Sequence, residues 1–168
     1  MEGPSLRGER LALVGRAEEH MPHLRRIRRT PAVAAWWPAP EPSWSADDEP
    51  EEWHWTVLVD DTVIGGVDAY EEEDPDYRSA NIDLYLDPAW HGKGFGAEVV
   101  RTVARWLFDE RGHHRLTIDP AADNHVAIRS YTSVGFKPVG VMRQYERGVD
   151  GEGWHDGLLL DMLRPELT

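Results

Sequence analysis

The chain has 168 residues, no cysteine and a formal net charge of −13 at pH 7. The length predicts a single domain over residues 1–168. The lack of cysteine excludes disulfides and thiol chemistry, and the acidic balance argues against nucleic acid as a partner because phosphates would be repelled. No run reaches the roughly 18 apolar residues of a membrane helix, and the first residues show no basic-then-apolar signal. We therefore expect a soluble, cytoplasmic protein that does not bind membranes.

The acidity is concentrated in one segment. Between Glu41 and Tyr77 there are 14 Asp or Glu residues and no Lys or Arg, whereas the rest of the chain has 17 acids and 18 bases. A cleft lined by charges of one sign concentrates ligands of the opposite sign. The segment therefore predicts a polycationic small molecule as the partner. The alternative is a solvated acidic loop that only aids solubility.

The first predicted elements are a strand over residues 9–14 and an amphipathic helix over residues 17–29. The polar side of this helix has four arginines, Arg25, Arg26, Arg28 and Arg29. We interpret these arginines as a solvent face rather than as a nucleic-acid surface. Thr30-Pro31 is a suitable start for a second, short helix that ends at Trp36-Trp37.

Residues 38–52 contain four prolines and no helical or strand period, so they are predicted to form a loop. Loops of this length often serve as lids or binding loops. Trp36 and Trp37, just before the loop, could sandwich a sugar ring or could pack in the core at the helix end. Trp44, inside the loop, is expected to be exposed.

Alternating residues then predict strands over residues 53–59, 62–70 and 79–86, with an acidic hairpin loop over residues 71–76. In the last of these strands Asp83 shares a face with Asn81 and Tyr85, because side chains alternate between the two faces of a sheet. A carboxylate inside a central strand is costly unless it is paired or reaches solvent. Asp83 is therefore a candidate functional residue.

A glycine-rich turn follows this strand and opens a helix that is expected to end near Gly112. Gly92, Gly94 and Gly96 let a ligand approach the backbone closely. The free N–H groups of the first helical turn, together with the helix dipole, favour a phosphate or pyrophosphate. A Walker A loop is excluded because the required GK[ST] is missing, and the G-x-G-x-G spacing fits a dinucleotide fingerprint poorly.

A short strand over residues 115–118 closes on Asp119-Pro120, and a second helix, capped by Asn124 or Asp123, runs to Gly135. The last strands are predicted over residues 136–142 and 157–162, with a turn-rich connection over residues 146–153. The eight histidines show no metal-binding spacing, so no metal site is expected.

Two motifs resemble a known family. His91-x-x-Gly94-x-Gly96 resembles the Q/R-x-x-G-x-G/A loop of the GNAT N-acetyltransferases, with His91 where Gln or Arg is usual. The stretch from Asp119-Pro120 to Gly135-Phe136 is similar to the second half of the family's signature. Within the superfamily, residues 9–163 most resemble the aminoglycoside 6′-N-acetyltransferases. The resemblance implies the GNAT fold of the α/β (α+β) class, a mixed and mostly antiparallel central sheet with helices on both faces.

The resemblance also implies acetyl-CoA as the co-substrate. Its pyrophosphate would lie on the loop residues His91, Gly92, Lys93, Gly94, Phe95 and Gly96. Its pantetheine would pair with the backbone of Leu84, Tyr85 and Leu86, and Asn124 and Ala127 are further cofactor-binding candidates. Tyr131 would protonate the leaving thiolate, unless it is a core residue on the helical face that it shares with Ile128 and Val134.

The acceptor amine must lose a proton, and the candidates for that task are Asp83 and Asp119, acting as base or as acceptor-binding residues. Asp119 could instead cap the turn before Pro120. Further acceptor-binding candidates are Trp36, Trp37, Glu72 and Asp156, and Glu71, Glu73, Asp74 and Asp76 are secondary ones.

The resemblance, together with the acidic segment, implies transfer of an acetyl group from acetyl-CoA to an aminoglycoside amine, in the first place the 6′-amine, which would inactivate the antibiotic. One alternative is another acceptor, such as a 2′-amine, a hydroxylysine-type siderophore precursor or a protein N-terminus. Another is a non-catalytic acyl-CoA-binding module, which would tolerate loss of Tyr131 and Asp83. The protein is expected to be a monomer or a homodimer.

Overall fold

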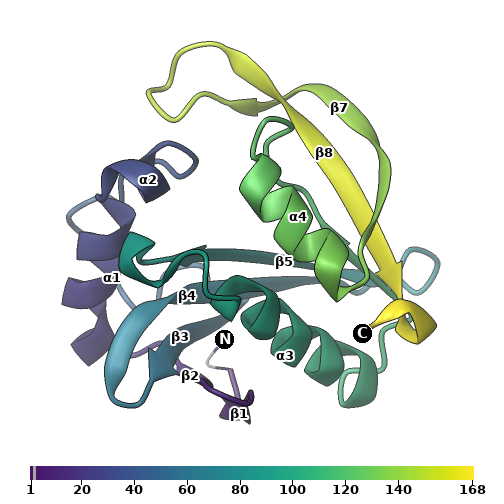
Figure 1. Ribbon diagram of the computed structural model, residues 1–168, viewed down its shortest axis with the longest axis horizontal. Coiled ribbons are helices and arrows are strands. Elements are labelled where there is room, and N and C mark those ends of the chain that lie inside the picture. The colour runs from purple at the N-terminus through teal and green to yellow at the C-terminus, as the bar shows by residue number, and fades with distance from the viewer. Residues whose placement is uncertain (2) are drawn as a thin grey trace.

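The computed structural model describes residue 1 and residues 3–168, and its main feature is an eight-stranded sheet flanked by helices (Figure 1). The helices are α1 (Met21–Arg28), α2 (Pro31–Ala34), α3 (Phe95–Asp109) and α4 (His125–Val134). The strands are β1 (Leu6–Arg7), β2 (Ala12–Gly15), β3 (Trp53–Val59), β4 (Thr62–Glu72), β5 (Ser79–Leu86), β6 (Arg115–Ile118), β7 (Lys137–Arg147) and β8 (Trp154–Leu163). Their order is β1-β2-β3-β4-β5-β6-β8-β7, and only the β5–β6 pair among them is parallel. The predicted mixed, mostly antiparallel sheet is confirmed.

The alternation of side chains along β5 explains why both faces of the sheet are covered. Ile82 and Leu84 belong to the larger core, to which α3 contributes Val99 and Leu107. Tyr85, on the other face, packs in a second core with the buried residues of α1, which are Met21, Leu24 and Ile27. Figure 1 shows α1 and α2 on one side of the sheet and α3 and α4 on the other, as predicted. In the described part of the chain, none of the helices is long and apolar enough to span a bilayer.

The sheet splits between its two parallel strands. β5 and β6 pair only at Ala80–Leu116 and Asn81–Thr117, whereas β5 stays paired with β4 as far as Leu86. Within the described residues, the backbone of residues 82–86 therefore has no strand partner on the side of β6. A free strand edge offers N–H and C=O groups with which an extended ligand can pair.

The strands at both ends of the chain differ from the prediction. A turn closed by the Gly8 N–H on the Leu11 carbonyl (2.9 Å) separates β1 from β2, so the predicted strand over residues 9–14 is wrong in its first half. β7 and β8 are longer than predicted, so the connection between them consists only of residues 148–153. Since β7 is exposed along nearly its whole length, no apolar pattern in the sequence marks its end.

Candidate active site

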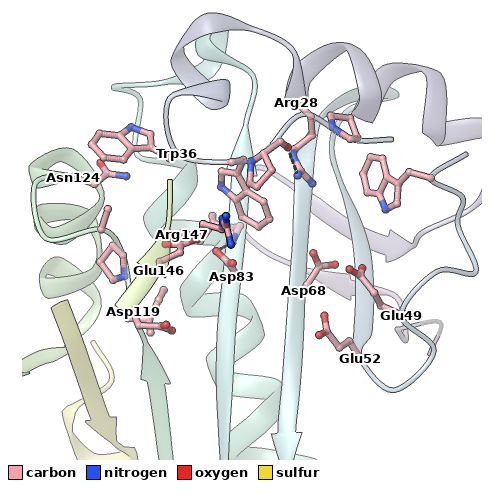
Figure 2. Close-up of a pocket in the computed structure, with 18 of the residues that line it drawn as sticks. Arg28, Trp36, Glu49, Glu52, Asp68, Asp83, Asp119, Asn124, Glu146 and Arg147 are labelled. Carbon is pink, nitrogen blue, oxygen red and sulfur yellow. Dashed lines mark hydrogen bonds between the residues drawn. The ribbon is translucent and has the colours of Figure 1, made fainter. Parts of the chain in front are cut away.

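A cavity of about 860 Å³ opens where β5 and β6 separate. Eight carboxylic acids from the loop over residues 38–52 and from the surrounding strands line it: Glu41, Asp48, Glu49, Glu52, Asp68, Asp83, Asp119 and Glu146. Two arginines, Arg28 and Arg147, also line the cavity. In Figure 2, Asp83 lies centrally, Asp119 and Glu146 lie to one side, and Asp68, Glu49 and Glu52 lie to the other. Such a lining attracts cations and repels anions.

Asp83, on β5, lines this cavity. Asp83 is an exposed residue, but it faces a cavity whose walls displace part of the water around it. This desolvation, and next the nearby charges of Asp68 and Asp119, raise the pKa of Asp83 well above its usual value, although the Leu84 N–H donates to its Oδ1 (2.9 Å). A carboxylate with a raised pKa is a stronger base than an ordinary aspartate.

Asp119 lies in the same cavity, at the end of β6. Asn81 Nδ2 donates to its Oδ1 (2.7 Å), and the hydroxyl of Tyr145 donates to its Oδ2 (2.7 Å). Both contacts come from side chains on other strands, which fits a held functional carboxylate better than the alternative role of a turn cap. The two hydrogen bonds fix the plane of the carboxylate.

Tyr131, on α4, was predicted to be either a proton donor in the site or a core residue, and its position in the structure is compatible with both. It belongs to the larger core and is 8% exposed, and it also lines the cavity. Burial, and then the charges of Asp83 and Asp119, raise the pKa of Tyr131 far above its usual value. Its hydroxyl therefore stays protonated at neutral pH and can serve as a proton donor to a group in the cavity.

The glycine turn forms the N-terminus of α3. Gly92 (φ 71°) and Gly94 (φ 81°) adopt left-handed backbone conformations, and Gly94 caps the helix. His91 fastens the turn to the end of β5, because its Nε2 lies 2.8 Å from the Leu86 carbonyl oxygen. Arg10 donates to the Lys93 carbonyl (2.9 Å) and is also paired with Glu98 in the first turn of α3 (2.8 Å), so it holds the turn in place. The free N–H groups of the first turn, the helix dipole and the Lys93 side chain suit a phosphate group.

Replacing Gly94 by Ala is expected to weaken acetyl-CoA binding about tenfold, because a left-handed non-glycine residue costs about 1–2 kcal/mol and the turn relieves that strain by moving. Space is not the cause, since an added Cβ would meet only Arg10, at 3.4 Å. Gly112→Ala is the matched control. Gly112 lies beyond the end of α3, has a φ of 70°, and an added Cβ there would meet no atom within 4 Å. Calorimetric titration with acetyl-CoA checks this; equal affinities of the two variants would contradict it.

The remaining predicted site residues divide into two groups. Trp36, Trp37 and Asn124 line the cavity, and Asn124 also caps α4 by accepting from the N–H of Ala127 (3.3 Å). Glu72 and Asp156 are not among the lining residues. Glu72 accepts from the Asp74 N–H (2.9 Å) in the hairpin loop, and Asp156 accepts from the Gln144 N–H (2.8 Å) in β7.

Arginines fasten the loop over residues 38–52. This corrects the predicted solvent face for Arg25 and Arg28, whereas Arg26 and Arg29 are exposed as predicted. Arg28 donates to the Pro38 carbonyl (2.7 Å), Arg25 to the Trp44 carbonyl and Arg16 to the carbonyls of Ala46 (3.3 Å) and Asp48 (2.8 Å). The Arg16 and Arg28 guanidinium groups lie over the Trp44 ring, at 5.4 and 5.3 Å from its centre. Trp44 is therefore half-buried and not exposed as predicted.

Sequence reasoning missed several cavity residues, above all Asp68. In the β4–β5 register Asp68 lies directly opposite Asp83. Like charges in opposed positions destabilise a sheet, and here His54 Nδ1 (2.5 Å) and Arg16 (3.8 Å) offset the charge of Asp68. The strand pattern did not reveal this pair, because it depends on the register: pairing the predicted strand ends, residues 70 and 79, would set Asp68 opposite Asn81 instead.

Glu49, Glu52 and His54 lie close enough together to be considered as a metal site, with ligand atoms within 4.8 Å of one another. Both imidazole nitrogens already have partners: Nδ1 faces Asp68 (2.5 Å) and Nε2 faces the Glu49 carbonyl (2.8 Å). His54 therefore links two parts of the cavity wall and has no nitrogen free for a metal ion.

Comparisons with known proteins agree with this geometry. Probable N-acetyltransferase YjcK of Bacillus subtilis (strain 168) is 30% identical over 121 residues, 71% of this chain and 66% of that protein. Aminoglycoside N(6′)-acetyltransferase type 1 of Klebsiella pneumoniae is 27% identical over 131 residues, 66% of this chain and 65% of that protein. The chain thus matches just under two thirds of the length of these relatives.

A solved structure shows the same fold over the whole chain. Ribosomal-protein-S5-alanine acetyltransferase from Vibrio fischeri has a TM-score of 0.82 at 15% identity, covering 99% of this chain and 100% of that one. The family model of the acetyltransferase (GNAT) domain matches residues 10–137, well over half of the chain. The protein therefore belongs to the GNAT acetyltransferase family.

Proposed function

We propose that this protein transfers an acetyl group from acetyl-CoA to an amine of an aminoglycoside, in the first place the 6′-amine, and so inactivates the antibiotic. The observation that carries the proposal is the cavity lined by eight carboxylic acids and two arginines. A polycationic acceptor matches that charge, and tryptophans in the wall offer flat surfaces to its sugar rings. The Klebsiella pneumoniae relative, named as an aminoglycoside 6′-acetyltransferase, supports the same substrate class.

Three parts of the chain would hold acetyl-CoA, which supplies an activated acetyl thioester. The N-terminal turn of α3 suits its pyrophosphate. The free edge of β5 over residues 82–86 suits its extended pantetheine arm. Along that edge the Leu84 N–H is bonded to Asp83 Oδ1 (2.9 Å), so Asp83 is adjacent to the backbone that would align the thioester.

The chemistry needs two proton transfers, and the cavity has a group for each. As the amine nitrogen bonds to the thioester carbon and the carbon–sulfur bond breaks, Asp83 takes the proton that the amine loses, directly or through water. Tyr131 gives a proton to the departing sulfur. Asp119 holds an ammonium group of the acceptor beside Asp83.

The rival acceptors fit the cavity less well. A hydroxylysine-type precursor or a protein N-terminus carries fewer positive charges, so most of the carboxylates would remain unpaired. Likeness of fold does not decide between them, because one GNAT fold serves different acceptors. The charge of the cavity is the feature that favours an aminoglycoside.

The test is release of free thiol from acetyl-CoA with a panel of amines: kanamycin, tobramycin, gentamicin, kasugamycin, N-hydroxylysine and an N-terminal peptide. We expect turnover with the aminoglycosides, and acceptors with and without a 6′-amine identify the position. The acceptor KM should rise with added salt, because screening weakens attraction between a polycation and the cavity. Turnover with N-hydroxylysine or the peptide, and none with aminoglycosides, would overturn the proposal.

A further inference from the structure

Tyr145 reaches the cavity from β7 and touches a residue of the proposed chemistry. Its hydroxyl donates to Asp119 Oδ2 (2.7 Å), on the opposite side of the carboxylate from the contact that Asn81 makes with Oδ1 (2.7 Å). Asp119 is thus held between side chains of β5 and β7, two strands that are not neighbours in the sheet.

A bulge in β7 brings Tyr145 to this position. Met142 pairs with Gly157 and Glu146 pairs with His155, so three residues of β7 lie opposite a single residue of β8. Gln144, in the bulge, has a φ of 49°, which is unusual for a residue with a side chain, and its N–H donates to Asp156 Oδ1 (2.8 Å). Bulges next to active sites commonly re-aim a side chain.

Gly157, which pairs with Met142 at the edge of the bulge, leaves room for the tyrosine ring. A Cβ added to Gly157 would lie 2.8 Å from a ring carbon of Tyr145 and 3.3 Å from the terminal methyl of Met142. Real Cβ atoms essentially never approach another atom so closely, so the position of the ring depends on a glycine here. Asp156 and Gly157 therefore both support one orientation of Tyr145.

We propose that Tyr145 is a positioning residue for Asp119: its hydroxyl orients the carboxylate toward the acceptor amine, and the β7 bulge exists to place it. This inference rests on the proposed function, since it assigns Tyr145 a part in acceptor binding. The hydrogen bond to Asp119 first, and then burial, raise the pKa of Tyr145 to about 12. The hydroxyl therefore remains a donor throughout the neutral range.

The kinetic test compares Tyr145→Phe with Tyr70→Phe, a control tyrosine on β4 that is exposed and outside the cavity. Loss of one hydrogen bond to a charged group is expected to raise the acceptor KM about tenfold in Tyr145→Phe and to leave the KM for acetyl-CoA unchanged. Gly157→Ala keeps the hydroxyl but displaces the ring, so it should change the acceptor KM in the same direction. Wild-type kinetics in both Tyr145→Phe and Gly157→Ala would overturn the inference.

A second test needs no substrate. With tyrosine labelled by ¹³C at Cζ, the Tyr145 resonance is assigned by its absence in Tyr145→Phe. At pH 10.5 Tyr145 should remain protonated in the wild type, and it should ionise at a lower pH in Asp119→Asn, where the carboxylate is gone. Ionisation at the same pH in both proteins would show that Tyr145 does not contact Asp119 in solution. If the wild type turned over no aminoglycoside while this titration behaved as expected, the proposed substrate would fail and the link between Tyr145 and Asp119 would stand.

Discussion

Replacing Asp83 by Asn is expected to lower kcat/KM for the acceptor by about 100-fold or more, the range for loss of a general base. The amide oxygen can still accept from the Leu84 N–H, so strand β5 and acetyl-CoA binding should be preserved. Asp74→Asn is the matched control, because Asp74 also accepts from a backbone N–H, that of Asp76 (2.9 Å), and lies in a hairpin loop outside the cavity. Unchanged kinetics in Asp83→Asn would remove Asp83 from the chemistry.

The pH dependence gives Asp83 a second signature. Desolvation and the charges of Asp68 and Asp119 raise its pKa in the folded protein, so the active carboxylate form becomes populated only as pH rises through that value. In the wild type, kcat/KM should increase with pH across this step, and Asp83→Asn should lack it. Rate measurements between pH 5 and about 9 on both proteins check the difference.

The same substitution should stabilise the protein. A carboxyl group whose pKa is raised on folding costs stability above its unfolded pKa, because the folded state resists ionisation. Removing the charge removes this cost, so thermal unfolding at pH 7 should shift to higher temperature in Asp83→Asn. Lower activity with higher stability is the pattern expected of a residue kept for function.

Local signals were enough to predict the elements that are proposed to hold the cofactor. The alternation over residues 79–86, the glycine spacing at Gly92 and Gly94 and the cap at Asn124 each depend on a few neighbouring residues, and the structure has all three where the sequence placed them. Helix stripes, caps and left-handed turns are determined by contacts within a turn or two of the chain, so a single sequence contains them.

The proposed acceptor side could be predicted only in part, because it depends on contacts between distant segments. Tyr145 reaches Asp119 through a bulge whose position follows from the β7–β8 register. Arg25 and Arg28 face a proline-rich loop that has no periodic pattern, so the arginines looked like a solvent face. The sequence pointed to Asp83 for a different reason: an acid inside a central strand departs from the usual pattern of burial, and such departures are expected at functional sites.

Glu71 differs in role from the acidic residues beside it, although all of them look alike in the sequence. The sequence places it with Glu72 and Glu73 in one acidic loop, as a secondary candidate for contacting ammonium groups. In the structure its side chain is 5% exposed and accepts four hydrogen bonds: two from Arg111 (both 3.0 Å), one from Trp53 (2.7 Å) and one from His113 (2.6 Å). It joins the end of β4 to the segment after α3 and does not line the cavity.

Replacing Glu71 by Ala is expected to lower the free energy of unfolding by about 1–3 kcal/mol, the cost of leaving a buried hydrogen-bond donor without its partner. The substitution leaves Arg111 and the 1% exposed His113 side chain without their carboxylate. Glu72→Ala is the control, since Glu72 is the next residue of the same strand and makes one hydrogen bond, to the Asp74 N–H. Urea unfolding at pH 7 should show a loss of no more than about 1 kcal/mol for Glu72→Ala.

The contribution of Glu71 should also disappear in acid. The desolvation of its carboxyl group is outweighed by the hydrogen bonds from Arg111, Trp53 and His113, which lower its pKa from 4.5 to about 2. A lowered pKa gives stability that is complete above the unfolded value and is lost as pH falls through the folded one. The stability difference between wild type and Glu71→Gln should therefore be constant above pH 5 and shrink between pH 4.5 and about 2. A difference that stays constant down to the acid limit of folding would show that the carboxylate charge is not what stabilises this junction, and that the side chain acts there through packing alone.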